Sequence, residues 1–270
     1  LTTKGSMLAA LNHGKLSREQ ENMEDILTSN VFGVFKYATD STVLVDFLAM
    51  AQTLGGQRPL FELPPNLVSV KFEFWPKFSY SNCKPCEPDG LLRLTWPENN
   101  TLSILVESKY RSGKSSYPDQ GSLPNDQLAR EWENLKRSSH TDSCSPVLIY
   151  LTADVGLPLD ALQVSESELR AKRGETGMLC WLSWRSLLPL VEKHHLPIFQ
   201  DLAAMLLRLN LVYFKGVSIA RAKSLNWSFK EDEAGYCWDF KTIQTGWHFG
   251  GCTARWQDYR CAQVGWRFVG

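Results

Sequence analysis

The feature that most constrains the fold of this chain is an apolar run that ends in three polar residues. Residues 102–106 read Leu-Ser-Ile-Leu-Val, and Glu107, Ser108 and Lys109 follow directly. A short aliphatic run is typical of a central strand that is buried on both faces of a sheet. Charged residues are costly inside such a strand unless they serve a purpose. We therefore predict a strand over 102–110 whose last residues belong to a functional site.

The flanking sequence predicts a mixed α/β domain whose central sheet is covered by helices on both faces. Helical spacing, strand alternation and turn residues together predict helices over 16–27, 42–54, 126–138, 185–193 and 198–209, and strands over 68–78, 90–96, 102–110, 147–151 and 178–184. A loop and a short helix should precede residue 178. Pro97 to Asn100 should connect two of these strands as a hairpin.

The C-terminal part of the chain differs from the rest in the spacing of its aromatic residues. From about Ser218 onward, aromatic residues recur in pairs two positions apart, such as Trp227 with Phe229 and Trp238 with Phe240. This spacing puts both rings on one face of a strand. We predict a large first domain over 7–215 and a small antiparallel β appendage over 216–270, with residues 1–6 as a vector remnant. Two interpretations of these aromatic side chains are that they form the small hydrophobic core of the appendage or that they are a surface on which unpaired bases stack. We favour the core.

Composition limits the classes of function that the chain can serve. Lys and Arg number 29 and Asp and Glu number 29, so the net charge is zero and any contact with a polyanion must use local patches. The sequence has no apolar stretch long enough to cross a membrane and no signal-peptide pattern, and we expect a cytoplasmic protein without membrane contact. The seven cysteines argue against a disulfide framework. Cys83 and Cys86 form a single CxxC, which we interpret as a chance pair rather than half of a zinc site.

Asp89, Glu107 and Lys109 together suit metal-assisted hydrolysis. Asp89 precedes one predicted strand and Glu107 ends the next, so an antiparallel hairpin would bring the two carboxylates together. One or two carboxylates with several waters make an adequate Mg²⁺ site. Lys109 shares a face with Glu107 because strand side chains alternate, and its ammonium could stand beside a phosphate or an attacking water. The alternative is that Asp89 is a turn residue and that Glu107 pairs with a lysine, Lys109 or Lys114, on a solvated edge.

Pro88-Asp89 followed by Glu107-Ser108-Lys109 resembles the motif that names the PD-(D/E)XK nuclease superfamily. The resemblance covers residues 16–215. It implies a restriction-endonuclease-like core, that is, an α/β fold with a mixed central sheet flanked by helices. It also implies that Asp89 and Glu107 hold Mg²⁺ or Mn²⁺, with the Ser108 carbonyl as an extra ligand and Lys109 as the orienting group.

The same resemblance implies two further site residues. The family places a helix before the motif, often with an acidic residue that completes the metal site, and Glu24 is our first choice and Glu21 our second. Exonuclease-type members carry a glutamine on the helix after the motif, and Gln127 is the matching residue. Glu131 stands where some of those enzymes have a tyrosine, which is a departure from that subgroup.

The implied activity is hydrolysis of phosphodiester bonds, in DNA rather than RNA, in bacterial (phage) defence or mobile-element biology. We expect Lys109, Arg111, Lys114 and Arg130 to contact the nucleic acid, and the Ser- and Gly-rich loop 111–125 to close over its backbone. Paired cuts in a duplex would require a homodimer, and a separate protein partner is a further expectation. The alternatives are a catalytically silent binding subunit with the same fold, and a metal hydrolase that uses histidines. The second lacks support, since His194 and His195 are adjacent and point apart.

Overall fold

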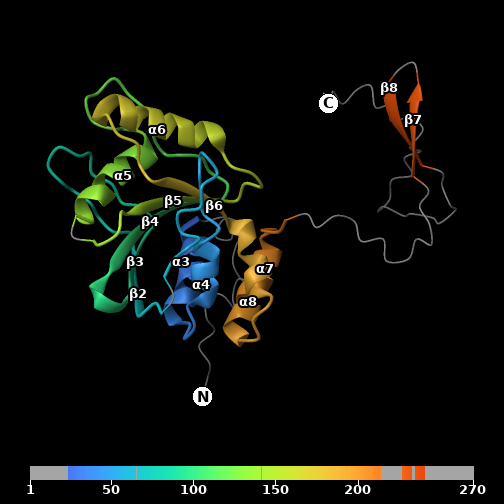
Figure 1. Ribbon diagram of the computed structural model, residues 1–270, viewed down its shortest axis with the longest axis horizontal. Helices are drawn as coiled ribbons and strands as arrows, with labels where there is room; N and C mark the ends of the chain where they lie inside the picture. The colour runs from blue at the N-terminus through green and yellow to red at the C-terminus, as the bar shows by residue number, and fades with distance from the viewer. Residues whose placement is uncertain (1–23, 65, 141, 214–226, 233–234, 241–270) are drawn as a thin grey trace. The chain divides into compact units, whose positions relative to one another are not determined.

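The computed structural model describes residues 24–64, 66–140, 142–213, 227–232 and 235–240. The chain divides into two compact units, residues 1–214 and 215–270. All candidate site residues that the structure describes lie in the first unit, which is an α/β domain with an open six-stranded sheet (Figure 1).

The strands of this sheet lie in the order β1-β6-β5-β4-β3-β2. They are β1 (Gln52–Thr53), β2 (Ser69–Phe74), β3 (Gly90–Thr95), β4 (Thr101–Lys109), β5 (Val147–Thr152) and β6 (Leu179–Ser183). β2, β3 and β4 form an antiparallel meander, while β4, β5 and β6 run parallel and β1 pairs antiparallel with β6. The sheet is therefore mixed, as the sequence predicts.

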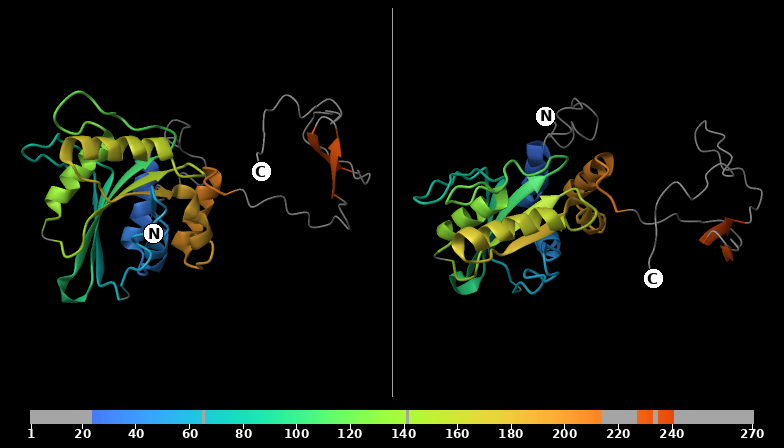
Figure 2. Two further views of the ribbon diagram at one scale, coloured as in Figure 1. Left: turned by 45° about the horizontal axis from the view of Figure 1, so that its top comes forward. Right: turned by 90° about the horizontal axis from the view of Figure 1, so that it is seen from above.

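Helices cover both faces of the sheet, as Figure 1 and Figure 2 show. One face carries α5 (Gln127–Ser138) and α6 (Leu159–Arg173); the other carries α3 (Glu24–Tyr37), α4 (Thr42–Leu48), α7 (Leu188–Val191) and α8 (Pro197–Arg208). Short 3-10 turns occupy Pro97–Asn99 and Trp184–Ser186. Alternate residues of β4 serve the two cores, with Ile104 and Val106 facing α3 and Leu105 facing α5. This double burial explains the aliphatic run in β4.

The hairpin register puts the polar ends of β3 and β4 at one edge of the sheet. Gly90 pairs with Val106, so Asp89, one residue earlier, lies beside Glu107. β5 runs parallel to β4, and its end at Thr152 pairs with Lys109. The crossover between β4 and β5 contains α5, whose first residue is Gln127. Four segments thus meet at this edge.

The structure corrects the boundaries of three predicted helices. The helix predicted over 16–27 continues to Tyr37, because Val31, Phe32 and Phe35 are buried in the core; residues 16–23 lie outside the described part of the chain. The helix predicted over 42–54 ends at Leu48, since β1 begins at Gln52. The short helix expected before β6 is the 15-residue helix α6.

The second unit contains a described antiparallel pair, β7 (Trp227–Asp232) and β8 (Gly235–Phe240). Trp227 pairs with Phe240 and Phe229 with Trp238 in its register. The other predicted aromatic pairs lie outside the described residues. Across the residues that the structure describes, none of the helices combines the length and apolar character needed to span a membrane.

Candidate metal centre

Three carboxylates from three separate segments converge at the polar edge of the sheet. Glu24 begins α3, Asp89 precedes β3 and Glu107 lies near the end of β4, and one oxygen of each lies within 4.8 Å of the others. Asp89 and Glu107 are buried and Glu24 is half-buried. We call Glu24, Asp89 and Glu107 the carboxylate trio. It is the one such acidic group that the described residues contain.

Ser108 and Thr28 fix the position of Asp89. The backbone N–H and the hydroxyl of Ser108 both donate to Oδ2 of Asp89, each at 2.7 Å. The Ser108 hydroxyl lies 2.5 Å from that of Thr28 on α3, and Thr28 donates to the carbonyl of Glu24 one turn earlier. This chain ties helix α3, strand β4 and Asp89 into one polar network. The predicted role of the Ser108 carbonyl as a ligand stays a prediction.

The chain just after β4 holds Glu24. Its Oε2 accepts hydrogen bonds from the backbone N–H of Tyr110 at 3.0 Å and from the hydroxyl of Ser112 at 2.6 Å. Its Oε1 lies 2.9 Å from Nζ of Lys109. A residue far away in sequence is thereby held against the motif strand. Glu21, our second choice for this role, lies outside the described residues.

Lys109 lies between two members of the trio. Its Nζ donates to Oε1 of Glu107 at 2.6 Å and to Oε1 of Glu24 at 2.9 Å. Burial alone would lower the pKa of this ammonium, but the carboxylates of Glu107 and Glu24 outweigh burial and raise it. Lys109 is therefore a cation at neutral pH in the metal-free protein.

Gln127 reaches the trio from α5. Its amide Nε2 donates to Oε1 of Glu107, and its Oε1 accepts the backbone N–H of Ser115 at 2.7 Å. The amide orientation follows from these two contacts, because only nitrogen can donate and only oxygen can accept. The structure thus brings together the predicted residues Glu24, Asp89, Glu107, Lys109 and Gln127.

Burial and mutual repulsion make the trio an unfavourable place for negative charge. Burial raises the pKa of Asp89, although the two hydrogen bonds from Ser108 oppose this. Burial, followed by the charge of Asp89, raises the pKa of Glu107 to about 7. One lysine cannot neutralise three carboxylates.

A divalent cation fits this set of donors. Carboxylate oxygens are the hard ligands that Mg²⁺ and Mn²⁺ prefer, and a site of two or three carboxylates leaves room for water or a phosphate oxygen. Asp89, Glu107 and Glu24 would hold the ion, because their oxygens already converge. A cation would also relieve the repulsion that raises the pKa values of Asp89 and Glu107.

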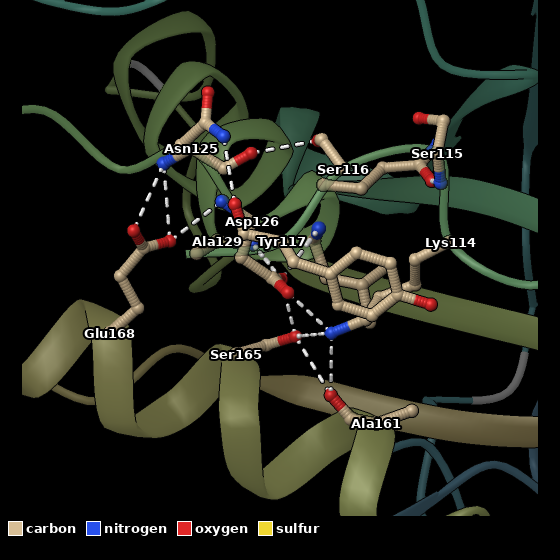
Figure 3. Close-up of polar contacts among 12 residues, drawn as sticks. Lys114, Ser115, Ser116, Tyr117, Asn125, Asp126, Ala129, Ala161, Ser165 and Glu168 are labelled. Carbon is tan, nitrogen blue, oxygen red and sulfur yellow. Dashed lines mark hydrogen bonds and ion pairs between the residues drawn. The ribbon is translucent and has the colours of Figure 1, made fainter. Parts of the chain in front are cut away.

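The loop after β4 is anchored to the protein at several points, and its closure over a substrate stays a prediction. Nζ of Lys114 lies inside the protein, where it donates to Asp126, to the Ala161 carbonyl at 2.9 Å and to the Ser165 hydroxyl at 3.1 Å (Figure 3). The side chain of Lys114 is only 2% exposed, so it cannot contact a nucleic acid as predicted. Lys114 therefore ties this loop to the start of α5 and to α6.

The other predicted contact residues lie on or near the surface. Arg111 is exposed and its guanidinium lies over the ring of Tyr110, 4.9 Å from the ring centre. Arg130 is half-buried on α5, one turn beyond Gln127, and its Nε has no hydrogen-bond partner among the described residues. Their contact with a nucleic acid stays a prediction.

Cys83 and Cys86 lie in the loop between β2 and β3. Cys83 is buried and Cys86 is half-buried, and both are free thiols. Burial raises the pKa of Cys86 to about 12 and also raises that of Cys83, so both thiols are protonated at neutral pH in the metal-free protein. Within the described part of the chain, no further His, Cys, Asp or Glu joins them in a metal-sized group.

Sequence analysis missed Thr28 and the buried role of Lys114. Thr28 follows Glu24 by one helical turn and therefore shares its face, which is a signal that the sequence offered. The burial of Lys114 depends on α6, and no local pattern reveals it.

Comparisons with known proteins gave no match for this chain: no family model, no curated protein and no solved structure was similar to it.

Proposed function

We propose that this protein is a divalent-metal-dependent nuclease that hydrolyses phosphodiester bonds, with DNA as the expected substrate and a restriction-endonuclease-like domain as its catalytic core. The observation that carries the proposal is the convergence of Glu24, Asp89 and Glu107 from distant parts of the chain, with Lys109 bonded to two of them. If Lys109 served only to stabilise the fold through an ion pair, one carboxylate would be enough to balance its charge. Three converging carboxylates, two of them buried, are better explained by a cation.

Bound Mg²⁺ or Mn²⁺ would supply Lewis acidity and a lowered pKa for a coordinated water. The protein's own residues do the positioning. Ser108 and Thr28 hold Asp89, and Gln127 holds Glu107, so the carboxylates keep their geometry before a cation arrives. Such preorganisation lowers the cost of assembling the reactive arrangement.

We assign Lys109 an electrostatic role. In the metal-free protein Glu107 and Glu24 raise its pKa, so its ammonium is protonated at neutral pH before a cation binds. It can stabilise negative charge on a phosphate that approaches the trio. Its fixed position between Glu24 and Glu107 sets where that phosphate would lie.

The biological setting is inferred from the resemblance to the family. We propose a cytoplasmic role in bacterial defence against phage or mobile elements, with a homodimer where both strands of a duplex are cut and with a separate protein partner. Arg111 and Arg130 are the candidate backbone contacts, since the charge of Lys114 is already used inside the protein.

The test is a cleavage assay of three proteins: wild type, Glu107→Gln and Asp46→Asn. Linear duplex, circular duplex, single-stranded DNA and RNA are each incubated with Mg²⁺, Mn²⁺ or EDTA. We expect metal-dependent cleavage by wild type and by the Asp46→Asn control, whose side chain is exposed on α4, and none by Glu107→Gln. Titration calorimetry with Mn²⁺ alone should show binding that Glu107→Gln weakens.

Two results would contradict the proposal. Cleavage that survives in Glu107→Gln would place the chemistry elsewhere or in a contaminant. If the wild-type protein neither cleaves any substrate nor binds Mn²⁺, the trio does not hold a cation. The interpretation as a catalytically silent binding subunit would then be the better one.

A further inference from the structure

A strained, exposed tryptophan lies directly beside the candidate metal centre. The backbone N–H of Trp75 donates to the carbonyl of Asp89 at 3.1 Å, so it is the cross-strand neighbour of a trio member. Trp75 is 40% exposed, and its φ of 50° lies in the left-handed region that bulky residues avoid. Strained residues persist where the surrounding structure imposes them, often next to a functional site.

Trp75 is one end of a continuous aromatic and cationic surface. Its ring centre lies 5.6 Å from that of Phe74. Nζ of Lys36 lies 5.9 Å from the ring centre of Phe74 and 5.9 Å from that of Tyr37, which is 76% exposed. We call Lys36, Tyr37, Phe74 and Trp75 the aromatic ledge. It joins the end of α3 to the end of β2 and leads to Asp89.

The ammonium of Lys36 is exposed and lies over the rings of Phe74 and Tyr37. A cation over two rings and next to a third is the arrangement that binds single-stranded nucleic acid, where bases stack on rings and cations hold phosphates. A paired duplex offers no free base face to such a ledge.

We propose that the aromatic ledge binds unpaired nucleotides of the substrate strand, with a base stacked on Trp75 and a phosphate held by Lys36. This inference rests on the proposed function and names its substrate class: single-stranded nucleic acid or the frayed end of a duplex. The base on Trp75 would belong to a nucleotide next to the scissile phosphate, because Trp75 adjoins Asp89.

The test compares three substitutions. Trp75→Asn removes the ring but tolerates a positive φ, so the backbone at Asp89 should keep its path. Trp75→Phe keeps a ring, and Phe61→Ala is the control. Phe61 is 65% exposed and lies three residues before Pro64. The Pro64 carbonyl accepts a hydrogen bond from the ring N–H of Trp96, which follows the end of β3 that is opposite to Asp89.

Binding of fluorescent oligothymidylate and of a duplex of equal length is measured by anisotropy in EDTA, and Mn²⁺ affinity is measured separately by calorimetry. We expect Trp75→Asn to weaken single-strand binding by about 5- to 150-fold, the range found for loss of one stacked base, and Trp75→Phe to restore most of it. Duplex binding, Mn²⁺ affinity and the Phe61→Ala variant should match wild type.

Different failures have different meanings. Unchanged single-strand binding by Trp75→Asn, with wild-type cleavage intact, would overturn the ledge alone and point to another ligand class, such as a protein. A parallel loss of duplex binding and Mn²⁺ affinity would show that Trp75 only supports Asp89, and would also overturn the ledge. Absence of cleavage and of all nucleic-acid binding in wild type would overturn the nuclease and the ledge together.

Discussion

Among single residues, the balance of charge in the trio decides what Lys109 is for. Three carboxylate oxygens lie within 4.8 Å of one another, and Lys109 bonds to two of those side chains. Removing the cationic partner from a buried group leaves uncompensated charge, which costs more than the intact pair contributes. Lys109 should therefore stabilise the metal-free fold as well as the reaction.

We predict that Lys109→Met lowers the free energy of unfolding of the metal-free protein by about 3 kcal/mol and abolishes cleavage. Mg²⁺ should recover most of this stability, since a cation that binds only the folded state restores the missing positive charge. Urea denaturation with and without Mg²⁺ measures both effects. Lys71→Met, on the exposed face of β2, should change stability by less than about 0.5 kcal/mol. Equal losses in both variants would refute the role of Lys109.

Glu131 is a further buried acid, on α5 one turn after Gln127. It is 1% exposed, and its Oε2 has no hydrogen-bond partner among the described residues. Burial, followed by the charge of Glu107, raises its pKa well above the usual 4.5. Its contribution to stability is thus most favourable below the unfolded-state pKa of about 4.5, and is lost as the pH rises through the higher folded-state value.

Glu131→Gln should raise the unfolding free energy by about 1 to 3 kcal/mol near pH 8, and this gain should shrink toward pH 5. Thermal unfolding across this pH range measures the difference, with Glu62→Gln, an exposed substitution, as the control. A gain that is the same at every pH would mean that Glu131 does not titrate as its burial requires.

At the scale of elements, the sequence predicted the central strands, α5 and α8 closely, but it missed β1 and placed the end of β2 too late. The run that ends at Glu107 fixed β4, because a strand buried on both faces must be aliphatic throughout. The end of α3 was missed because Phe32 and Phe35 are buried by α8 and neighbouring helices, whose positions the local pattern does not contain. Lys114 was predicted to contact a nucleic acid because it lies next to the motif in a Ser- and Gly-rich loop. Its partners Asp126 and Ser165 come from two other helices.

Figure 3 shows how the Lys114 network joins the loop after β4 to two helices. Asp126 caps α5 by accepting the backbone N–H groups of Leu128 and Ala129, and Ser165 of α6 donates to the same carboxylate. Glu168 accepts the backbone N–H of Asp126 at 2.7 Å. The network therefore fixes the start of α5, where Gln127 contacts Glu107.

Lys114→Met should lower the unfolding free energy by about 3 kcal/mol, because Asp126 is left buried without its cation. Adding Asp126→Asn, which keeps a capping oxygen but removes the charge, should recover part of that loss. The control is Lys136→Met, whose surface pair with Glu175 should contribute under about 1 kcal/mol. Chemical denaturation of all four proteins is the measurement, and a double variant less stable than Lys114→Met would contradict the pairing.

In the whole molecule, the sheet combines local and distant pairings. The meander from β2 to β4 joins neighbours in sequence, whereas the parallel pairs β4–β5 and β5–β6 need crossovers through α5 and α6. This arrangement of alternating strands and helices was readable from the sequence. The assembly of Glu24 with the hairpin was proposed from family resemblance, since no local spacing connects residues so far apart.

The carboxylate trio combines a contact within one hairpin with a contact from a distant helix. Its members therefore come together at different stages of folding. Asp89 and Glu107 meet when one short hairpin closes, but Glu24 arrives only when a distant helix docks on the sheet. Distant contacts form after local ones because closing a long loop costs more entropy. A cation that needs all three carboxylates would bind only after this helix has docked. Because it would hold the helix to the hairpin, it would oppose the opening of this edge of the sheet.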